Sequence, residues 1–141
     1  MSESTFDRMV THTLAEMAVF FTYGRTQETK ESEWRLGVQV EGGAAVQLHL
    51  ARLGDWLFVR SSIDRSADTI ASAELLELQS KVPLARLVVT GEAAGRSLMA
   101  LAEVHSSDVA RVPVVARAIN AVAQLASDAS VGLDRTVTPS S

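Results

Sequence analysis

The chain of 141 residues contains no cysteine. That absence excludes disulfide bonds, thiolate zinc sites, iron–sulfur ligation and cysteine nucleophiles together. The sequence also lacks an apolar run long enough to cross a bilayer, and its N-terminus lacks the basic region and long apolar region of a secretory signal. We therefore expect a cytoplasmic protein with no membrane partner.

Lysine occurs only at positions 30 and 81 and asparagine only at position 120, whereas arginine, alanine and valine are abundant. This bias is typical of a GC-rich bacterial genome. The net charge is −4, which does not favour general attraction to nucleic-acid phosphates or anionic lipid. Direct nucleic-acid binding is therefore disfavoured.

The length fits one domain, because a chain of this size can bury about two thirds of its unfolded surface in one core. We expect that domain to cover residues 1–128. Residues 129–141 are small, polar and without periodicity, which predicts a flexible C-terminal tail.

Three runs of alternating apolar residues, separated by two glycine turns, lie between positions 34 and 63. This pattern predicts an antiparallel three-stranded meander. A two-residue loop with glycine first is typical of a type II′ turn. If Gly54 and Asp55 form that loop, Leu50 pairs with Val59 and one face of the hairpin is mostly apolar.

The first turn of the meander can be predicted from the same requirement, since a slip of one residue would move every side chain to the opposite face. A two-residue loop at Gly42 and Gly43 would set Val38 against Gln47. A three-residue loop at positions 42–44 instead sets Val38 against Leu48. The longer loop is favoured because it pairs apolar with apolar.

The second face of the meander carries an unusual set of side chains. The register places five residues of interest there: Leu53, Trp56, Phe58, Arg60 and His49. A sheet covered on one side usually shows polar residues on the other, so an aromatic patch with an adjacent arginine indicates a surface for a partner or a second subunit. The alternative is that a helix of the same chain covers both aromatics.

Helices are expected on either side of the meander. Apolar residues recur at helical spacing over positions 4–22 and again over positions 67–82, where Ser66 can cap the helix. Residues 25–33 are polar and have no apolar period. They are predicted to form a loop.

The last third of the chain predicts a hairpin and a long helix. In the hairpin, residues 84–104, a four-residue loop pairs Val88 with Met99 and leaves both faces apolar. The helix is expected over residues 107–128, with its regular part beginning or kinking at Pro113. Hairpin and helix together offer more apolar surface than one core needs, which predicts a homodimer.

No motif in the sequence indicates a reaction. His12, His49 and His105 fall in three separate elements without the spacing of metal ligands. The loop from Gly91 to Ser97 lacks the length and the lysine of a phosphate-binding loop, and the serines have no nucleophile-elbow context. We therefore predict a protein that is not an enzyme, with no catalytic residues, no metal and no cofactor.

The expected fold is a single α+β domain with the order helix, three-stranded meander, helix, two-stranded hairpin, helix (α-βββ-α-ββ-α). Over residues 4–128 this order resembles the type III secretion chaperone-like fold, in particular its YbjN-type bacterial family. The elements that carry the resemblance are residues 6–21, 34–63, 67–82, 84–104 and 112–126. The resemblance implies a small, homodimeric, non-catalytic protein that binds another protein, with a role in regulation or stress response.

Three functions are compatible with the sequence. The first is a chaperone-like adaptor that binds a partner protein. The second is a small-ligand sensor that uses a cavity between the helices and the sheet. The third is a nucleic-acid-associated protein that uses arginines on its strands.

Overall fold

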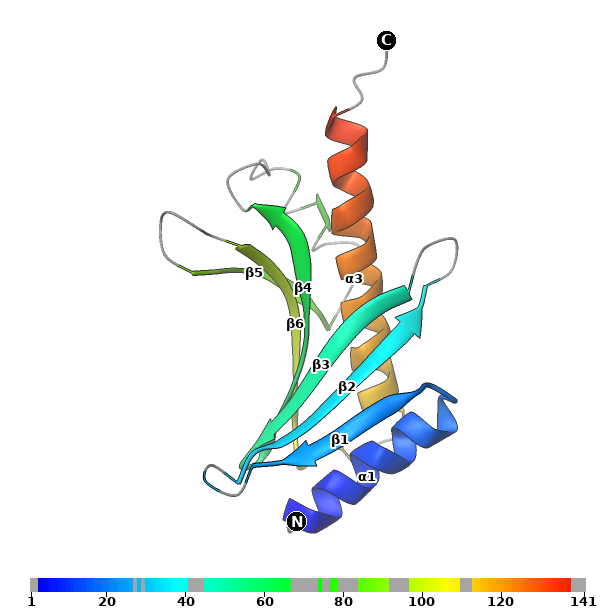
Figure 1. Cartoon of the computed structure of the whole chain (residues 1–141), viewed down its shortest axis with the longest axis vertical. Coiled ribbons are helices and arrows are strands. Elements are labelled where there is room, and N and C mark those ends of the chain that lie inside the picture. Colours follow the sequence, from blue (N-terminus) through cyan, green and yellow to red (C-terminus); the bar gives the residue numbers. More distant parts are fainter. Residues whose placement is uncertain are drawn as a thin grey trace.

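The computed structural model describes residues 3–26, 28, 30–40, 45–66, 74, 77–78, 84–91, 97–109 and 113–137. Its bounded elements are α1 (Glu3–Glu16), β1 (Phe21–Arg25), β2 (Ser32–Gln39), β3 (Ala45–Leu53), β4 (Trp56–Ser66), β5 (Arg86–Thr90), β6 (Ser97–His105) and α3 (Val114–Val137). Within these residues the strands form one six-stranded antiparallel sheet in the order β1-β2-β3-β4-β6-β5. In Figure 1, α3 runs behind the sheet and α1 lies near β1.

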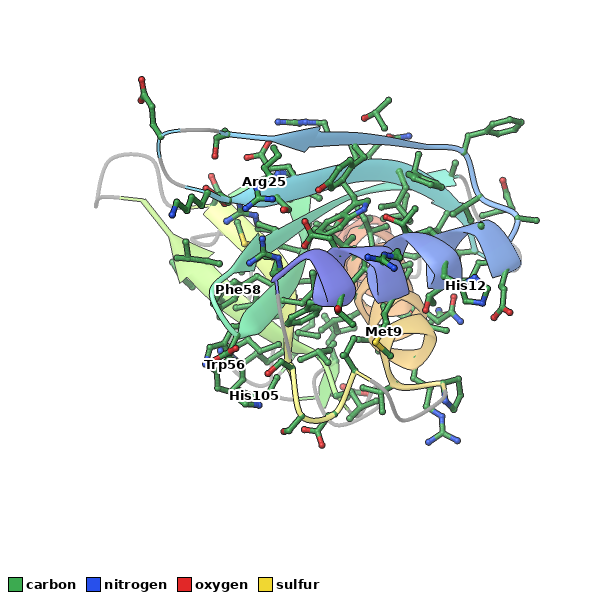
Figure 2. All side chains as sticks on the ribbon, turned by 90° about the horizontal axis from the view of Figure 1, so that it is seen from below. Met9, His12, Arg25, Trp56, Phe58 and His105 are labelled. Carbon is green, nitrogen blue, oxygen red and sulfur yellow. The ribbon has the colours of Figure 1, made fainter. Side chains whose placement is uncertain are left out.

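α1 and α3 pack on the same face of the sheet, which we call the inner face. Burial alternates along the strands, as in β2 and β6, so that one side chain in two points into the core. Trp34 and Leu50 from the sheet, Val10 from α1 and Ile119 from α3 are completely buried together. The opposite side of the sheet, the outer face, is covered by neither α1 nor α3 (Figure 2).

The predicted division into a three-stranded meander and a separate two-stranded hairpin is wrong. β4 pairs with β6, for example through Leu57 and Val104, so that both parts belong to one sheet. An isolated two-stranded hairpin is marginally stable in water. Joining β6 to β4 gives it a second hydrogen-bonded neighbour, and its alternate residues then complete the apolar face beneath α3.

The first helix is shorter than predicted, because α1 ends at Glu16 and not at position 22. Ala18 adopts a positive φ of 57° and turns the chain. The following residues form β1, which pairs with β2 from Phe21 opposite Leu36 to Arg25 opposite Ser32. The sequence gives no period over this segment, so only pairing with β2 defines the strand, and the expected loop over residues 25–33 is correspondingly too long.

The second hairpin of the meander has the predicted register. Leu50 pairs with Val59, and Leu53 pairs with Trp56 across the two-residue loop. Gly54 has a φ of 62°, and Asp55 has no positive φ. Only the first loop position is therefore left-handed, as a type II′ turn requires.

The first hairpin of the meander has a different register from the predicted one. Val38 pairs with Val46, and Leu36 with Leu48, so the partners differ from the expected ones by two positions. Side chains alternate with a period of two, and an even shift therefore leaves every residue on the expected face. The predicted three-residue loop at 42–44 lies outside the described residues.

The last third of the chain agrees with the predicted hairpin, since Val88 pairs with Met99. Of the helix predicted over residues 67–82, Glu74, Glu77 and Leu78 are helical and the rest lies outside the described residues. α3 begins immediately after Pro113, as expected, and continues to Val137, past the predicted boundary at Asp128.

The apolar side of α3 is covered by the chain's own sheet. Its buried residues recur at helical spacing: Val115, Ala118, Ile119, Val122, Ala123, Leu125, Ala126 and Ala129. α3 contacts β3, β4, β5 and β6. Within the described residues, the apolar side of α3 from which a homodimer was predicted is therefore used inside the chain.

A buried ion pair attaches α1 to the sheet. Arg52 points to the inner face and is fully buried, and its Nε donates a hydrogen bond to the carboxylate of Asp7 on α1. Ser32 also donates to that carboxylate, and the hydroxyl of Tyr23 donates to it over 2.7 Å. Nearby, the indole of Trp34 donates to the Thr11 hydroxyl of α1 at 3.1 Å. Side chains of β1, β2 and β3 are thus bonded to one turn of α1.

Burial by itself raises the pKa of Asp7, because it disfavours the charged form. Hydrogen bonds from Arg52, Ser32 and Tyr23, with the charge of Arg52, outweigh that effect and hold the pKa below its ordinary value of 3.8. The unfolded chain then binds a proton more readily than the folded one. The resulting stabilisation is fully present above pH 3.8 and is lost as the pH falls through the lower folded pKa.

Replacing Asp7 by Asn should lower the free energy of unfolding by about 3–5 kcal/mol, because Arg52 would keep a buried charge without a counter-charge. The measurement is urea denaturation followed by circular dichroism. Glu103→Gln is the matched control, since it breaks the exposed pair between Glu103 and Arg86 and should cost no more than about 1 kcal/mol.

Equal losses in the two variants would contradict a structural role for the buried pair. The pH dependence provides a second readout. Wild-type stability should fall as the pH drops below 3.8, and Asp7→Asn should remove that part of the decline.

Candidate functional site

The aromatic patch predicted from the register lies on the outer face of the sheet. Leu53 is 54% exposed and Trp56 is 43% exposed, while Phe58 beside them is half-buried. The chain's other tryptophan, Trp34, is completely buried in the core. Neither α1 nor α3 covers these side chains, as the alternative of a covering helix from the same chain would require. The helix predicted over residues 67–82 lies mostly outside the described residues.

Pairing between β4 and β6 extends the patch. Trp56 lies opposite His105, and the two rings meet edge to face with centroids 4.8 Å apart. Figure 2 shows them side by side, with Phe58 nearby. Phe58 lies opposite Glu103, and half-buried Met99 and Leu101 continue the same face along β6. The apolar surface therefore spans β3, β4 and β6.

His49 and Arg60, also predicted to share this face, are directly bonded. Arg60 Nε donates to His49 Nδ1 at 2.8 Å. An accepting Nδ1 implies that the neutral ring carries its proton on Nε2. His49 Nε2 is buried and has no hydrogen-bond partner among the described residues, and it lies 3.6 Å from the Glu33 carboxylate.

Burial is the largest reason why the pKa of His49 lies below its ordinary value of 6.5. The charges of Arg60 and Arg35 lower the pKa further, and Glu33 raises it by less than these effects together. His49 is therefore neutral at pH 7. Since the unfolded chain binds this proton more readily, the free energy of unfolding decreases as the pH falls below 6.5, until the folded pKa is passed.

The arginines of the outer face differ in their partners. Arg86 forms an ion pair with Glu103. Arg60 is bonded to a neutral imidazole, so that this bond does not compensate its charge. Arg35 lies opposite His49 and makes no hydrogen bond or ion pair within the described residues. Arg35 and Arg60 therefore lie next to the aromatic patch, and the neutral ring of His49 compensates the charge of neither arginine.

All five predicted surface residues share the outer face: Leu53, Trp56, Phe58, Arg60 and His49. Three further residues of this face were not predicted: Glu33, which was expected in a loop, and Glu103 and His105 of β6. Glu33 lies on the outer face because β2 pairs with β3. The contribution of Glu103 and His105 depends on β4 pairing with β6, which joins segments about 40 positions apart in the chain. No local pattern indicates that pairing.

Within the described residues, no three His, Asp or Glu side chains are arranged to hold a metal ion. None of the helices in those same ranges is long and apolar enough to cross a bilayer. In comparisons with known proteins, neither a protein-family model nor a curated protein matches the sequence.

The charges around His49 predict opposite effects of two substitutions on its pKa. Arg60→Gln should raise the pKa, because it removes a neighbouring cation and the donor to Nδ1, whereas Glu33→Gln should lower it by removing a neighbouring carboxylate. An NMR titration of the imidazole Cε1 proton measures both. Shifts in the same direction would contradict the arrangement of Glu33, His49 and Arg60.

Proposed function

We propose that this chain is a non-catalytic, protein-binding adaptor whose docking surface is the outer face of the sheet around Leu53, Trp56 and Phe58. The observation that carries the proposal is the contrast between the two tryptophans, since Trp34 is enclosed by the core and Trp56 is held at the surface. Large aromatic side chains with an adjacent arginine are the groups that contribute most to protein interfaces.

The chemistry of the face specifies the partner segment. Apolar side chains of the partner segment would cover Leu53, Trp56 and Phe58, and a carboxylate of the partner segment would bind Arg35 and Arg60. Arginine binds carboxylates through paired N–H donors, and this recognition is stronger than that between neutral groups. An acidic segment that also carries aromatic or aliphatic residues therefore fits the face best.

Homodimerisation belongs to the same proposal. Since α3 uses its apolar side within the chain, the half-buried Val88, Met99 and Leu101 of the outer face are the supporting surface. We also propose a cytoplasmic location and, from the family resemblance, a role in regulation or stress response.

Trp56→Ala combined with Phe58→Ala should abolish partner binding without unfolding the chain. Loss of a central aromatic anchor costs about 2 kcal/mol or more, which is roughly thirtyfold in affinity. The test is capture from native lysate with immobilised wild-type and variant chains, followed by affinity measurement on the purified partner. Trp34→Ala, in contrast, should cost about 3–5 kcal/mol of stability.

Phe20→Ala is the control for aromatic exposure alone, because Phe20 is 95% exposed but precedes β1 and lies away from the patch. A protein retained by wild type and by Phe20→Ala, but not by the double variant, is the expected result. If the double variant remains folded and retains the same protein with the same affinity, the docking surface is wrong.

A further inference from the structure

A groove on the other side of the molecule lies between α1 and the first turn of α3. It has a volume of about 620 Å³, within the range of about 300–1,000 Å³ that is typical of small-molecule sites. Its position, between two helices, differs from the cavity between helices and sheet considered above. Figure 2 shows Met9 and His12 on the side of α1 that faces the start of α3.

One complete face of α1 lines the groove. Its residues follow helical spacing: Thr5, Arg8, Met9, His12, Thr13 and Glu16, with Met17 directly after the end of the helix. The opposite face of α1, with Phe6, Val10 and Leu14, is buried in the core. From Thr5 to Glu16 the helix rises about 16 Å, so the groove offers a track long enough for an extended aliphatic chain.

Apolar side chains line the groove. Met9 and Met17 are partly buried against the core, and Val109 and Val115 are buried behind them. The Thr13 hydroxyl donates to the Met9 carbonyl oxygen at 3.0 Å, which satisfies its hydrogen within α1. Methionine side chains are flexible and adapt to apolar ligands of different shape.

The two ends of the groove differ in charge. At one end, Arg8 is exposed and makes no hydrogen bond or ion pair with the described part of the chain. At the other end, Glu16 is bonded to His12, with the Nε2 and Oε1 atoms 3.0 Å apart. An incoming cation would have to displace His12, whereas an incoming anion finds Arg8 without a competitor.

From these observations we propose that the groove binds an amphipathic anion, with an aliphatic chain along Met9 and Met17 and a carboxylate at Arg8. Burial of the chain supplies most of the affinity, and the guanidinium selects the charge of the head group. This proposal is independent of the outer face, because the two surfaces share no residue.

The four methionines of the chain provide the test. Met9 and Met17 line the groove, while Met99 lies on the outer face. In a ¹³C-methyl NMR titration of the full chain with monomeric dodecanoate, the Met9 and Met17 signals should shift and saturate, and the Met99 signal should remain in place. A response of Met99 alone would place the ligand on the outer face and overturn the groove proposal.

Head-group selectivity is tested with dodecyltrimethylammonium, which has the same twelve-carbon aliphatic chain as dodecanoate and the opposite charge. It should bind at least about tenfold more weakly than dodecanoate, and Arg8→Gln should weaken dodecanoate by about tenfold. Arg117→Gln, which removes an exposed arginine of α3 outside the groove lining, should leave the affinity unchanged. Equal affinities for both ligands, or for wild type and Arg8→Gln, would overturn the proposal.

Blocking the groove gives a further check. Met9→Trp should eliminate saturable dodecanoate binding, with circular dichroism to confirm that the variant is folded. If Met9→Trp does not fold, the affinity of Arg8→Gln for dodecanoate tests the groove instead. If the Met9 and Met17 signals respond to protein dilution and not to dodecanoate, a second copy of the chain covers the groove and the ligand proposal is wrong.

Discussion

The ion pair between Asp7 and Arg52 determines how the parts of this molecule are arranged. Removing two charges from water is costly, and the cost is offset here by hydrogen bonds that Arg52, Ser32 and Tyr23 make to one carboxylate. The bonded groups come from α1 and from three neighbouring strands, so one carboxylate joins the helix to β1, β2 and β3. Apolar contacts alone would specify the orientation of the helix less strictly.

Both proposed binding surfaces depend on this arrangement. Since Arg52 must point inward to reach Asp7, its neighbours Ala51 and Leu53 must point outward. Cross-strand pairing then places Phe58 and Trp56 on the outer face beside them. On the helix, the turn that carries Asp7 also directs Arg8 and Met9 toward the groove. The buried pair thus fixes which side chains of β3 point to the aromatic face and which side chains of α1 point to the groove.

Much of the local structure could be predicted from residue patterns. The type II′ turn at Gly54, the pairing of Val88 with Met99 and the start of α3 after Pro113 follow from turn chemistry, alternation and proline geometry, which act over a few residues. Asp7 was different: it falls within the helix predicted over positions 4–22, and nothing local indicates a partner 45 residues later. For the same reason β1 was not predicted: its first two residues were assigned to the helix, and Arg25 was assigned to the loop that follows.

Assignment of side chains to the two faces of the meander needed only the sequence, because side chains alternate strictly along a strand. Even the register error of two positions in the first hairpin left every residue on the expected face. Leu53, Trp56, Phe58, Arg60 and His49 were placed together for that reason. Only the tertiary structure decided that β4 pairs with β6, that α1 and α3 share the opposite face, and that Arg8 and Met9 border a groove. These features depend on contacts between segments far apart in the chain. The free energy of such contacts cannot be predicted from the residues of one short segment.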